Sequence, residues 1–430
     1  MVKRSLSSTS PVPPAMASID YSSWTKEQLI AKINQLESST TTTTEPAPPT
    51  KKQKQKKREF DWSKHNQRFI ALRFAYLGWN YNGLAYQYEP TALPTVEETL
   101  LEALSKSKLI KEPSLECCKF SRCGRTDKGV SAMNQVISLN VRSNLSPEQQ
   151  QDANNDKDEL NYMRILNSLL PMDIRVTAVC LRPPEKFDAR FSCKYRHYRY
   201  IFQKRDLDIE IMDQAARLYE GVHDFRNFCK IDGSKQITNY VRDIHHSRII
   251  HLKDDYYCFD LKGSAFLWHQ VRCMVAILFL VAQKLESISI IEDLTNVEKF
   301  PRKPVYEMAN EVPLVLYDCE YEEMEWIKYN KDAGRSFSLL FNKFPNLTYD
   351  TQIKSEMTKI MEHFVLEDVK PPIATLEGGR MHLGDGLGRN YTQYVPLSER
   401  HLNDTFEVIN ERHKEKKRRA KSATTEQSPE

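Results

Sequence analysis

The chain has 430 residues, a formal net charge of +4 and a pI near 8.4. A chain of this length forms one large or two modest domains, and its mildly basic charge permits a nucleic-acid partner without requiring one. The nine cysteines stand singly apart from Cys117 and Cys118, which excludes a zinc quartet of the usual spacing and a disulfide framework and favours a reducing compartment.

The N-terminal segment 1–59 is predicted to be a mobile basic extension. Its Ser, Thr and Pro runs and the basic cluster Lys51–Arg58 cannot bury apolar surface. Within the extension, Thr25–Glu37 has helical spacing, with Thr25 and Gln28 placed as a capping box. The cluster suits an import signal, a phosphate-binding arm or a solubilising segment equally well.

Strand and helix patterns alternate through the next part of the chain. Period-two alternation predicts strands, and apolar residues spaced by three and four predict helices. The strands are expected at Arg68–Tyr76, Asn134–Val141 and Ile174–Leu181, the helices at Val96–Leu109 and Tyr162–Leu170, and a polar insertion at Ser146–Glu159. The alternation predicts a mixed α/β fold.

One loop in this region, Cys123–Ala132, has a single carboxylate, Asp127, between two glycines and flanked by cations. Asp-Lys-Gly is also an ordinary turn signal, so a solvated turn explains it structurally. The functional explanation is that Arg125 and Lys128 hold an anionic substrate while Asp127 attacks it or removes a proton. That explanation predicts chemistry on a phosphate-bearing molecule.

A further strand is predicted at Lys194–Ile201, where rings and cations alternate on both faces. Aromatic packing between neighbouring strands accounts for such a pattern. Alternatively, the rings stack on bases and the cations meet phosphates of an RNA. The second interpretation makes Arg196 and Tyr198 candidates for substrate contact.

The stretch Ala265–Ala282 is almost wholly apolar except for His269, Gln270 and Arg272. It is too short and too charged for a membrane span, so we expect a helix buried in a soluble core. Arg272 then either reaches solvent from the edge of the helix or pairs with a carboxylate, because an unpaired buried charge costs several kcal/mol.

The sequence Cys-Gly-Arg-Thr-Asp-Lys-Gly-Val-Ser-Ala around Asp127 resembles the Gly-Arg-Thr-Asp-x-Gly-Val-x-Ala signature of the tRNA pseudouridine synthase A family. Four further segments resemble the family in the same order along the chain. They are Tyr76–Gln87 with the helix start Thr95–Glu98, the Ala-Arg-x-Ser block within Phe187–Tyr200, Ser264–Arg272, and Pro313–Tyr321. The resemblance covers most of the part predicted to be globular.

The resemblance implies a fold of two related subdomains that share an extended, mainly antiparallel sheet flanked by helices, with a central basic RNA-binding cleft. It implies that Asp127 is the catalytic carboxylate, kept ionised and oriented by a pair with Arg272. Tyr198 would stack on the extruded uracil and take the C5 proton, and Arg125 would fill the space that the base leaves. Isomerisation of uridine needs no redox step or hydrolysis, so no cofactor and no metal are expected.

Two segments resemble the eukaryotic branch of the family that modifies positions 38 and 39 in the tRNA anticodon stem-loop. They are Tyr219–Asp232, with the string His-Asp-Phe-Arg-Asn-Phe-Cys-Lys-x-Asp, and Asn390–Leu397. From chemistry alone, the first is either a packed surface segment or a junction whose cations meet phosphate. The predicted substrate-binding residues are Arg125, Lys128, Arg196, Tyr198, His223, Arg226 and Lys230.

The predicted domains after the extension are an N-terminal catalytic subdomain (60–202), a C-terminal catalytic subdomain (203–325), an extension packing on the core (326–411) and a basic disordered tail (412–430). The stretch Arg412–Lys421 of this tail leaves open the same three roles as Lys51–Arg58. The resemblance implies tRNA as partner and a homodimer, which the region after Tyr321 either preserves or blocks. We expect the nucleus and cytoplasm as locations and no membrane partner.

Two alternatives stay open at this point. A non-catalytic RNA-binding protein or RNA chaperone could have the same fold, and other enzymes also act on extruded bases. A deaminase needs a His and Cys zinc set that the sequence lacks, and a glycosylase would release free uracil. Whether Asp127 bonds to the sugar, adds to the uracil ring or deprotonates the sugar is also open.

Overall fold

The structure is a computed structural model that describes residues 24–39, 60–328, 335–366 and 379–425. The chain divides into two units, Met1–Glu59 and Phe60–Glu430. This division coincides with the predicted end of the N-terminal extension. The basic cluster Lys51–Arg58 lies outside the described residues.

The described part of the first unit is helix α1 (Lys26–Ser39). The Thr25 N–H donates to Gln28 Oε1 (2.9 Å), and the Gln28 N–H donates to Thr25 Oγ1 (3.4 Å). The predicted capping box is therefore confirmed, and it satisfies two of the backbone donors that a helix start leaves open.

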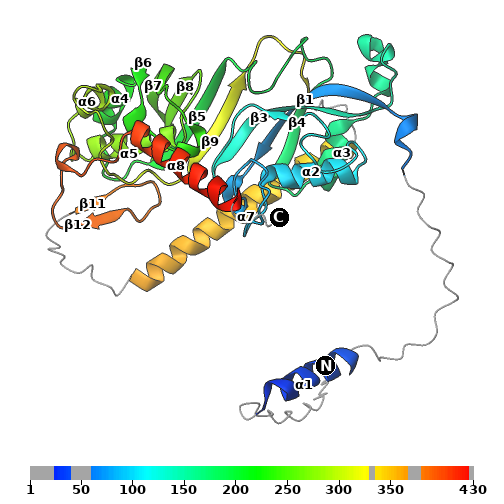
Figure 1. Cartoon of the computed structure of the whole chain (residues 1–430), viewed down its shortest axis with the longest axis horizontal. Coiled ribbons are helices and arrows are strands. Elements are labelled where there is room, and N and C mark those ends of the chain that lie inside the picture. The colour runs from blue at the N-terminus through cyan, green and yellow to red at the C-terminus, as the bar shows by residue number, and fades with distance from the viewer. Residues whose placement is uncertain (1–23, 40–59, 329–334, 367–378, 426–430) are drawn as a thin grey trace, which may run out of the picture. The chain divides into compact units, whose positions relative to one another are not determined.

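The second unit is built on a 10-stranded sheet in which β9 and β3 form the parallel pair and the other neighbours are antiparallel (Figure 1). Its order is β10-β4-β1-β3-β9-β5-β8-β7-β6, with β2 paired to β3. The strands are β1 (Asn66–Tyr76), β2 (Ser121–Arg122), β3 (Ser131–Ser143), β4 (Ile174–Cys180), β5 (Tyr195–Gln203), β6 (Gly221–Asp224), β7 (Val241–Lys253), β8 (Tyr256–Gly263), β9 (Leu314–Glu320) and β10 (Ile327–Lys328). The predicted α/β class with an extended, mainly antiparallel sheet is confirmed.

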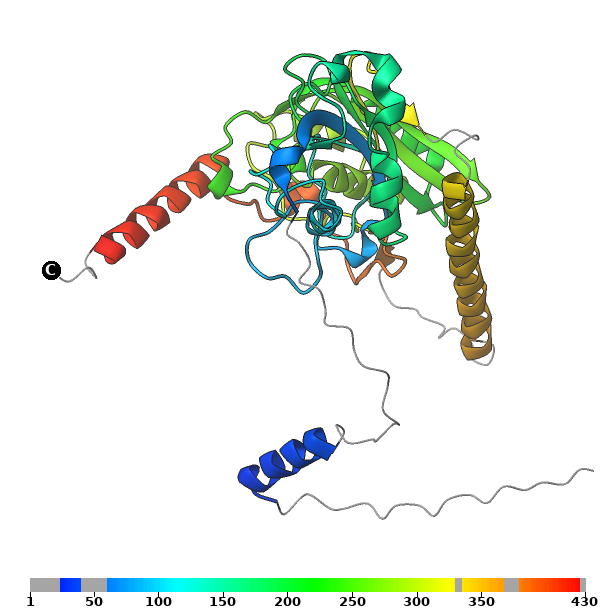
Figure 2. The ribbon, with the colours of Figure 1, turned by 90° about the vertical axis from the view of Figure 1, so that its right-hand side faces the viewer.

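Helices flank both ends of this sheet, and α3 contacts β4 while α4 contacts β7 (Figure 1). Beyond the sheet lie a long helix, a two-stranded sheet and a C-terminal helix that extends away from the body (Figure 2). The helices are α2 (Val96–Lys106), α3 (Tyr162–Leu169), α4 (Ile209–Arg217), α5 (Gln270–Ala282), α6 (Ile290–Thr295), α7 (Arg335–Leu366) and α8 (Phe406–Thr425), and the two strands are β11 (Gly379–Met381) and β12 (Arg389–Tyr391).

Strand β9 joins the two ends of the large sheet. It pairs with β5 along most of its length but with β3 only at Ser131 and Ala132, where β3 begins. The loop that carries Asp127 therefore leads directly into the junction. The pairing of β5 with β9 shifts register between His197 and Tyr198, and such a bulge re-aims the neighbouring side chains.

Helix α5 begins later than the apolar stretch predicts. His269 has a left-handed backbone (φ 62°), so the helix starts at Gln270. All residues of α5 are buried, which confirms the predicted core helix. No helix among the described residues is long and apolar enough to cross a membrane.

The prediction of a disordered tail from residue 412 is wrong for the described part, because helix α8 runs from Phe406 to Thr425. The start of α8 is fixed by packing: the ring of Phe406 lies against Tyr240, with centroids 5.0 Å apart. Charge composition alone did not reveal this anchor, since it comes from a residue far away in the sequence.

Candidate active site

The loop before β3 is anchored through Thr126, which is buried between two more exposed residues. The Thr126 hydroxyl lies 2.7 Å from the Tyr76 hydroxyl, and its carbonyl accepts the Leu84 N–H (3.2 Å). Arg125 on one side is exposed, and the Asp127 side chain on the other is 32% exposed. The loop is thus anchored by the buried Thr126, and it presents the Arg125 guanidinium and the Asp127 carboxylate at the surface.

Gly129 closes this loop in a conformation that requires glycine. Its φ is 81°, and a Cβ at this position would lie 2.8 Å from Glu311 Cγ. Left-handed backbone and close approach together favour glycine over any other residue. The close approach also brings Glu311, just before β9, next to the Asp127 turn.

Both carboxylate oxygens of Asp127 contact the residues that enter α5. The Trp268 indole N–H donates to Oδ1 (3.2 Å), and His269 Nε2 lies 3.3 Å from Oδ2. Burial raises the pKa of Asp127 above its ordinary value. The charge of Arg272 and the Trp268 hydrogen bond oppose this rise, and the charge of Glu311 adds to it. Ionisation of Asp127 thus depends on the α5 entry.

His269 is neutral beside this carboxylate. Burial lowers its pKa to about 4, and the nearby cations Arg272, Lys230 and Lys303 act in the same direction. Near neutral pH the contact of His269 Nε2 with Asp127 Oδ2 is therefore one between a neutral imidazole and a carboxylate rather than an ion pair. His269 Nδ1 is buried and has no hydrogen-bond partner among the described residues.

Arg272 pairs with Glu311, which corrects the predicted pair with Asp127. Arg272 Nη2 lies 2.7 Å from Glu311 Oε2, and Nε donates to the Ala309 carbonyl (2.7 Å). No ion pair between Arg272 and Asp127 is formed within the described residues. The guanidinium still lowers the pKa of Asp127 through its charge. Arg272 therefore acts on the carboxylate from a distance, because Glu311 and the Ala309 carbonyl accept its hydrogen bonds.

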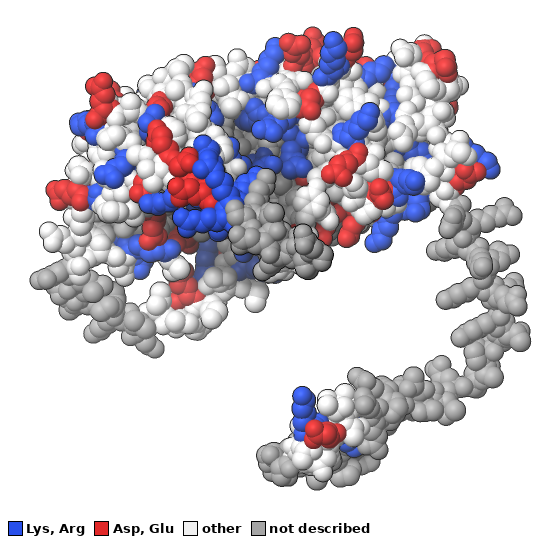
Figure 3. Space-filling view, viewed as in Figure 1, with Lys and Arg blue, Asp and Glu red and all other residues white. Residues whose placement is uncertain are grey.

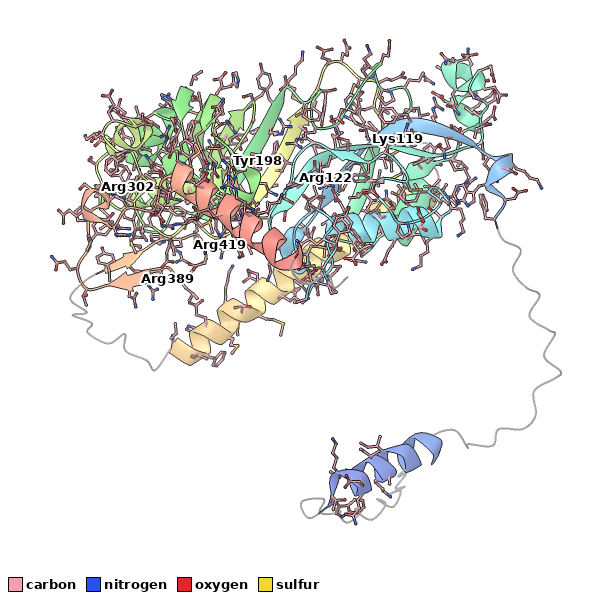
Figure 4. The ribbon with its side chains drawn as sticks, viewed as in Figure 1. Lys119, Arg122, Tyr198, Arg302, Arg389 and Arg419 are labelled. Carbon is pink, nitrogen blue, oxygen red and sulfur yellow. The ribbon has the colours of Figure 1, made fainter. Side chains whose placement is uncertain are left out.

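Tyr198 lies in β5 near the junction of the sheet and is 8% exposed (Figure 4). Its ring meets Phe266 edge to face, with centroids 5.0 Å apart. Burial raises the pKa of Tyr198, so its hydroxyl is protonated at neutral pH. A neutral phenol is a poor resting base, and this favours stacking or hydrogen bonding over an early proton transfer.

Arg196, predicted to contact substrate, is engaged within the protein. Its guanidinium donates to the backbone carbonyls of Ser264 (2.8 Å), Cys123 (2.9 Å) and Arg190 (2.9 Å). These carbonyls belong to three of the segments that resembled the family. Arg196 therefore joins the segments that build the site, whereas Arg125 and Lys128 are exposed.

The segment Tyr219–Asp232 reaches the site through Lys230. Lys230 Nζ lies 4.9 Å from the centroid of the Trp268 ring, and the Lys230 N–H donates to the Trp268 carbonyl (3.0 Å). The sequence did not single out Trp268, His269 or Glu311. The available signal was an aromatic residue and a histidine immediately before a buried helix that carries an arginine.

His223 and Arg226, also predicted to contact substrate, have internal partners. His223 Nε2 lies 2.8 Å from the Glu220 carbonyl, and Arg226 Nη2 lies 2.7 Å from Asp224 Oδ2. Contact of these two residues with RNA stays a prediction.

The face seen in Figure 3 has Lys and Arg side chains bordering a hollow near its middle. Such a surface suits a polyanion. Within the described ranges, no group of His, Cys, Asp and Glu is arranged to hold a metal ion.

Comparison with known proteins decides the family. A family profile described as tRNA pseudouridine synthase matches residues 215–322. The tRNA pseudouridine(38/39) synthase of Saccharomyces cerevisiae is 51% identical over 414 residues, covering 92% of each chain. The chain belongs to the tRNA pseudouridine synthase family. The predicted resemblance is confirmed, and the chain is an isomerase of this class.

Two further relatives of this tRNA pseudouridine synthase align over a smaller part. The human tRNA pseudouridine(38/39) synthase is 46% identical over 64% of this chain and 60% of its own length. The tRNA pseudouridine synthase A of Methanosarcina mazei is 31% identical over 62% of this chain and 90% of its own length. The archaeal alignment thus covers most of that relative but leaves more than a third of this chain unmatched.

Proposed function

We propose that this tRNA pseudouridine synthase converts uridine to pseudouridine at positions 38 and 39 of the tRNA anticodon stem-loop, with Asp127 as the catalytic carboxylate. The observation that carries the role of Asp127 is its placement: a partly exposed carboxylate on an anchored loop, with both oxygens contacted by the α5 entry. The position specificity rests on the names of the yeast and human relatives.

The reaction conserves all atoms of the nucleotide. The bond from N1 of uracil to C1′ breaks, the base turns, a bond forms between C5 and C1′, the C5 proton leaves and N1 gains a proton. An ionised carboxylate near C1′ supports any of the three roles open for Asp127. The part-buried site strengthens its interaction with charge that develops on the sugar.

Three predicted contacts complete this proposal. The exposed guanidinium of Arg125 is free to enter the RNA stack where the base has left. Lys128, exposed on the same loop, suits a phosphate of the flipped nucleotide. The Tyr198 ring suits a wall for the turning uracil.

The test uses the purified chain and unmodified tRNA transcripts, with new pseudouridines mapped at nucleotide resolution by a carbodiimide adduct. We expect modification at positions 38 and 39 without mass change or free uracil. Release of uracil would indicate a glycosylase, and RNA binding without new pseudouridine would indicate a chaperone. Modification elsewhere in the tRNA would overturn the position specificity alone.

Homodimer formation is part of the proposal and is supported by helix α7. Four of its eight large exposed apolar residues are separated by four, three and four positions, as in a coiled-coil seam. They are Ile353, Met357, Ile360 and Phe364. A second copy of the chain has the same stripe and suits it. Analytical ultracentrifugation should give a dimer for the wild type and a monomer for Met357→Glu with Phe364→Glu; a monomeric wild type would overturn the dimer.

Nuclear as well as cytoplasmic location is proposed from the basic cluster Lys51–Arg58. Replacing its lysines by glutamine in a fluorescent fusion should reduce the nuclear signal. An unchanged distribution would assign the cluster to another role.

A further inference from the structure

Helix α8 is docked by its first turns on the segment that follows η5, a short 3-10 helix (Arg226–Phe228). Asn410 of α8 is 6% exposed, and its side-chain amide donates to the Ile237 carbonyl (3.1 Å). In return, Gln236 Nε2 donates to the Asn410 carbonyl (3.1 Å). One hydrogen bond from the Asn410 side chain and one to its backbone carbonyl fix the register of α8 against this segment.

A glycine and two rings complete the dock. A Cβ on Gly233 would lie 2.7 Å from the Ile409 carbonyl oxygen, so the close approach of α8 depends on glycine. Phe406 packs against Tyr240 on one side, and the Arg226 guanidinium lies 5.4 Å from its ring centroid on another. The Arg226 side chain thus belongs to the dock.

The docking segment is continuous with the active site. Four residues after Arg226, Lys230 covers the Trp268 ring, and Trp268 hydrogen bonds Asp127. The position of α8 is therefore tied to the catalytic carboxylate through a short stretch of backbone. A ligand group held by α8 would have a fixed register relative to Asp127.

Beyond the dock, α8 is cationic and exposed (Figure 4). Arg412 has Asp404 as ion-pair partner and Lys414 has Glu411. Lys416, Lys417 and Arg419 are exposed, and in the part of the chain that the structure describes no acidic side chain forms an ion pair with them. These three cations are available to an external anion.

The composition of α8 discriminates between kinds of anionic partner. From Glu411 to Ala420 the helix has no apolar side chain larger than alanine. A membrane-surface helix needs a face of large apolar residues, and a helix that binds a protein groove needs apolar anchors at intervals of three and four. The same stretch has six Lys and Arg against two Glu, and a helix with this cationic excess and no large apolar residue fits the phosphate backbone of a nucleic acid.

We propose that α8 is a second tRNA-binding element that contacts tRNA phosphates outside the anticodon stem-loop. The inference rests on the proposed function, since the tRNA it would hold is the substrate at Asp127. Its cationic stretch extends roughly 10 to 15 Å beyond the dock at a rise of about 1.5 Å per residue, and Figure 2 shows the helix standing out from the body.

The test compares full-length tRNA with an isolated anticodon stem-loop. The variant Lys416→Gln, Lys417→Gln, Arg419→Gln removes the three available cations. The matched control Lys64→Gln, Lys354→Gln, Lys359→Gln removes the same charge from exposed lysines that already have acidic partners. Gly233→Val is a third variant that keeps every cation but displaces α8.

We expect the α8 variant to bind full-length tRNA at least about fivefold more weakly, with a salt slope lower by about 2. Its binding to the stem-loop should equal that of wild type and control. Gly233→Val should reproduce this pattern although its charge is unchanged. Unchanged tRNA affinity, or an equal loss for both RNAs, would overturn the proposal. Because binding is measured separately from turnover, a wild type that binds but makes no pseudouridine would instead contradict the proposed function.

Discussion

The Trp268 indole N–H donates to Asp127 Oδ1 at 3.2 Å, and this contact joins the α5 entry to the loop that carries Asp127. It also connects the segment Tyr219–Asp232 to the carboxylate, because Lys230 lies over the same ring. Trp268 thus contacts both Asp127 and the segment that resembles the family branch modifying positions 38 and 39. Its replacement should therefore affect both the reaction rate and the choice of uridine.

Trp268→Phe should move the acid limb of the pH profile for kcat/KM to higher pH. The hydrogen bond from Trp268 lowers the pKa of Asp127, so its loss raises that pKa and the carboxylate protonates sooner as pH falls. A hydrogen bond to a charged group contributes roughly 1.5 to 3 kcal/mol, so kcat/KM should fall at least about tenfold. Trp326→Phe, a tryptophan stacked on Arg73, is the control and should leave the limb in place. If the acid limb of the pH profile stays at the wild-type pH in both variants, ionisation of Asp127 does not determine that limb.

Glu311→Gln should shift the same limb in the opposite direction. The charge of Glu311 raises the pKa of Asp127, so a neutral amide at this position lets the carboxylate stay ionised to lower pH. Arg272 also loses its ionic partner, which brings a stability loss on the order of 3 kcal/mol. The two effects are read from pH-dependent turnover and from urea unfolding. A limb that moves to higher pH would contradict the electrostatic account.

Arg125 and Arg196 should respond differently to replacement by alanine. Arg125 is exposed, so its loss should reduce turnover strongly and leave the melting temperature within about 2 °C of wild type. Arg196 donates to three backbone carbonyls, so its loss should lower the free energy of unfolding by several kcal/mol, at roughly 1.5 kcal/mol or more for each bond. Calorimetry and urea titration check both, and equal stability losses would remove the distinction.

His269→Gln should reduce the acid sensitivity of folding. The pKa of His269 is lowered to about 4 in the folded protein, mainly by burial, against an ordinary value near 6.5. Below about pH 6.5 the unfolded chain therefore binds more protons than the folded one at this residue, and stability falls as pH falls toward 4. The unfolding free energy of wild type should lose roughly 2 to 3 kcal/mol more than the variant between pH 7 and pH 4. Parallel losses in both proteins would rule out this histidine as the source.

The elements with local signals were predictable from the sequence. The alternation in Arg68–Tyr76 and the apolar run before Ala282 depend on neighbouring residues only, and the structure has β1 and α5 there. The left-handed backbone of His269 was not predictable, because residues other than glycine adopt this conformation uncommonly.

The site was predictable as a set of residues but not as a set of contacts. Asp127 and Arg272 were identified through resemblance. The ion pair that Arg272 forms with Glu311 was not, because it depends on the chain before β9 passing close to Gly129. Sequence separation hides such an approach. For the same reason the sequence did not reveal that the Arg196 guanidinium donates to the distant carbonyls of Cys123 and Ser264. Arg226 differs, because its partner Asp224 is only two residues away.

Single-turnover pseudouridine formation by Asp127→Asn, with tRNA binding measured on the same preparation, tests the central role of Asp127 most directly. Asparagine keeps the size of the side chain and loses its charge, so the account predicts a rate reduced by at least about a thousandfold, with tRNA affinity within a few fold of wild type. Pseudouridine formed at the wild-type rate by this variant would contradict the account, because the reaction would then proceed without the carboxylate.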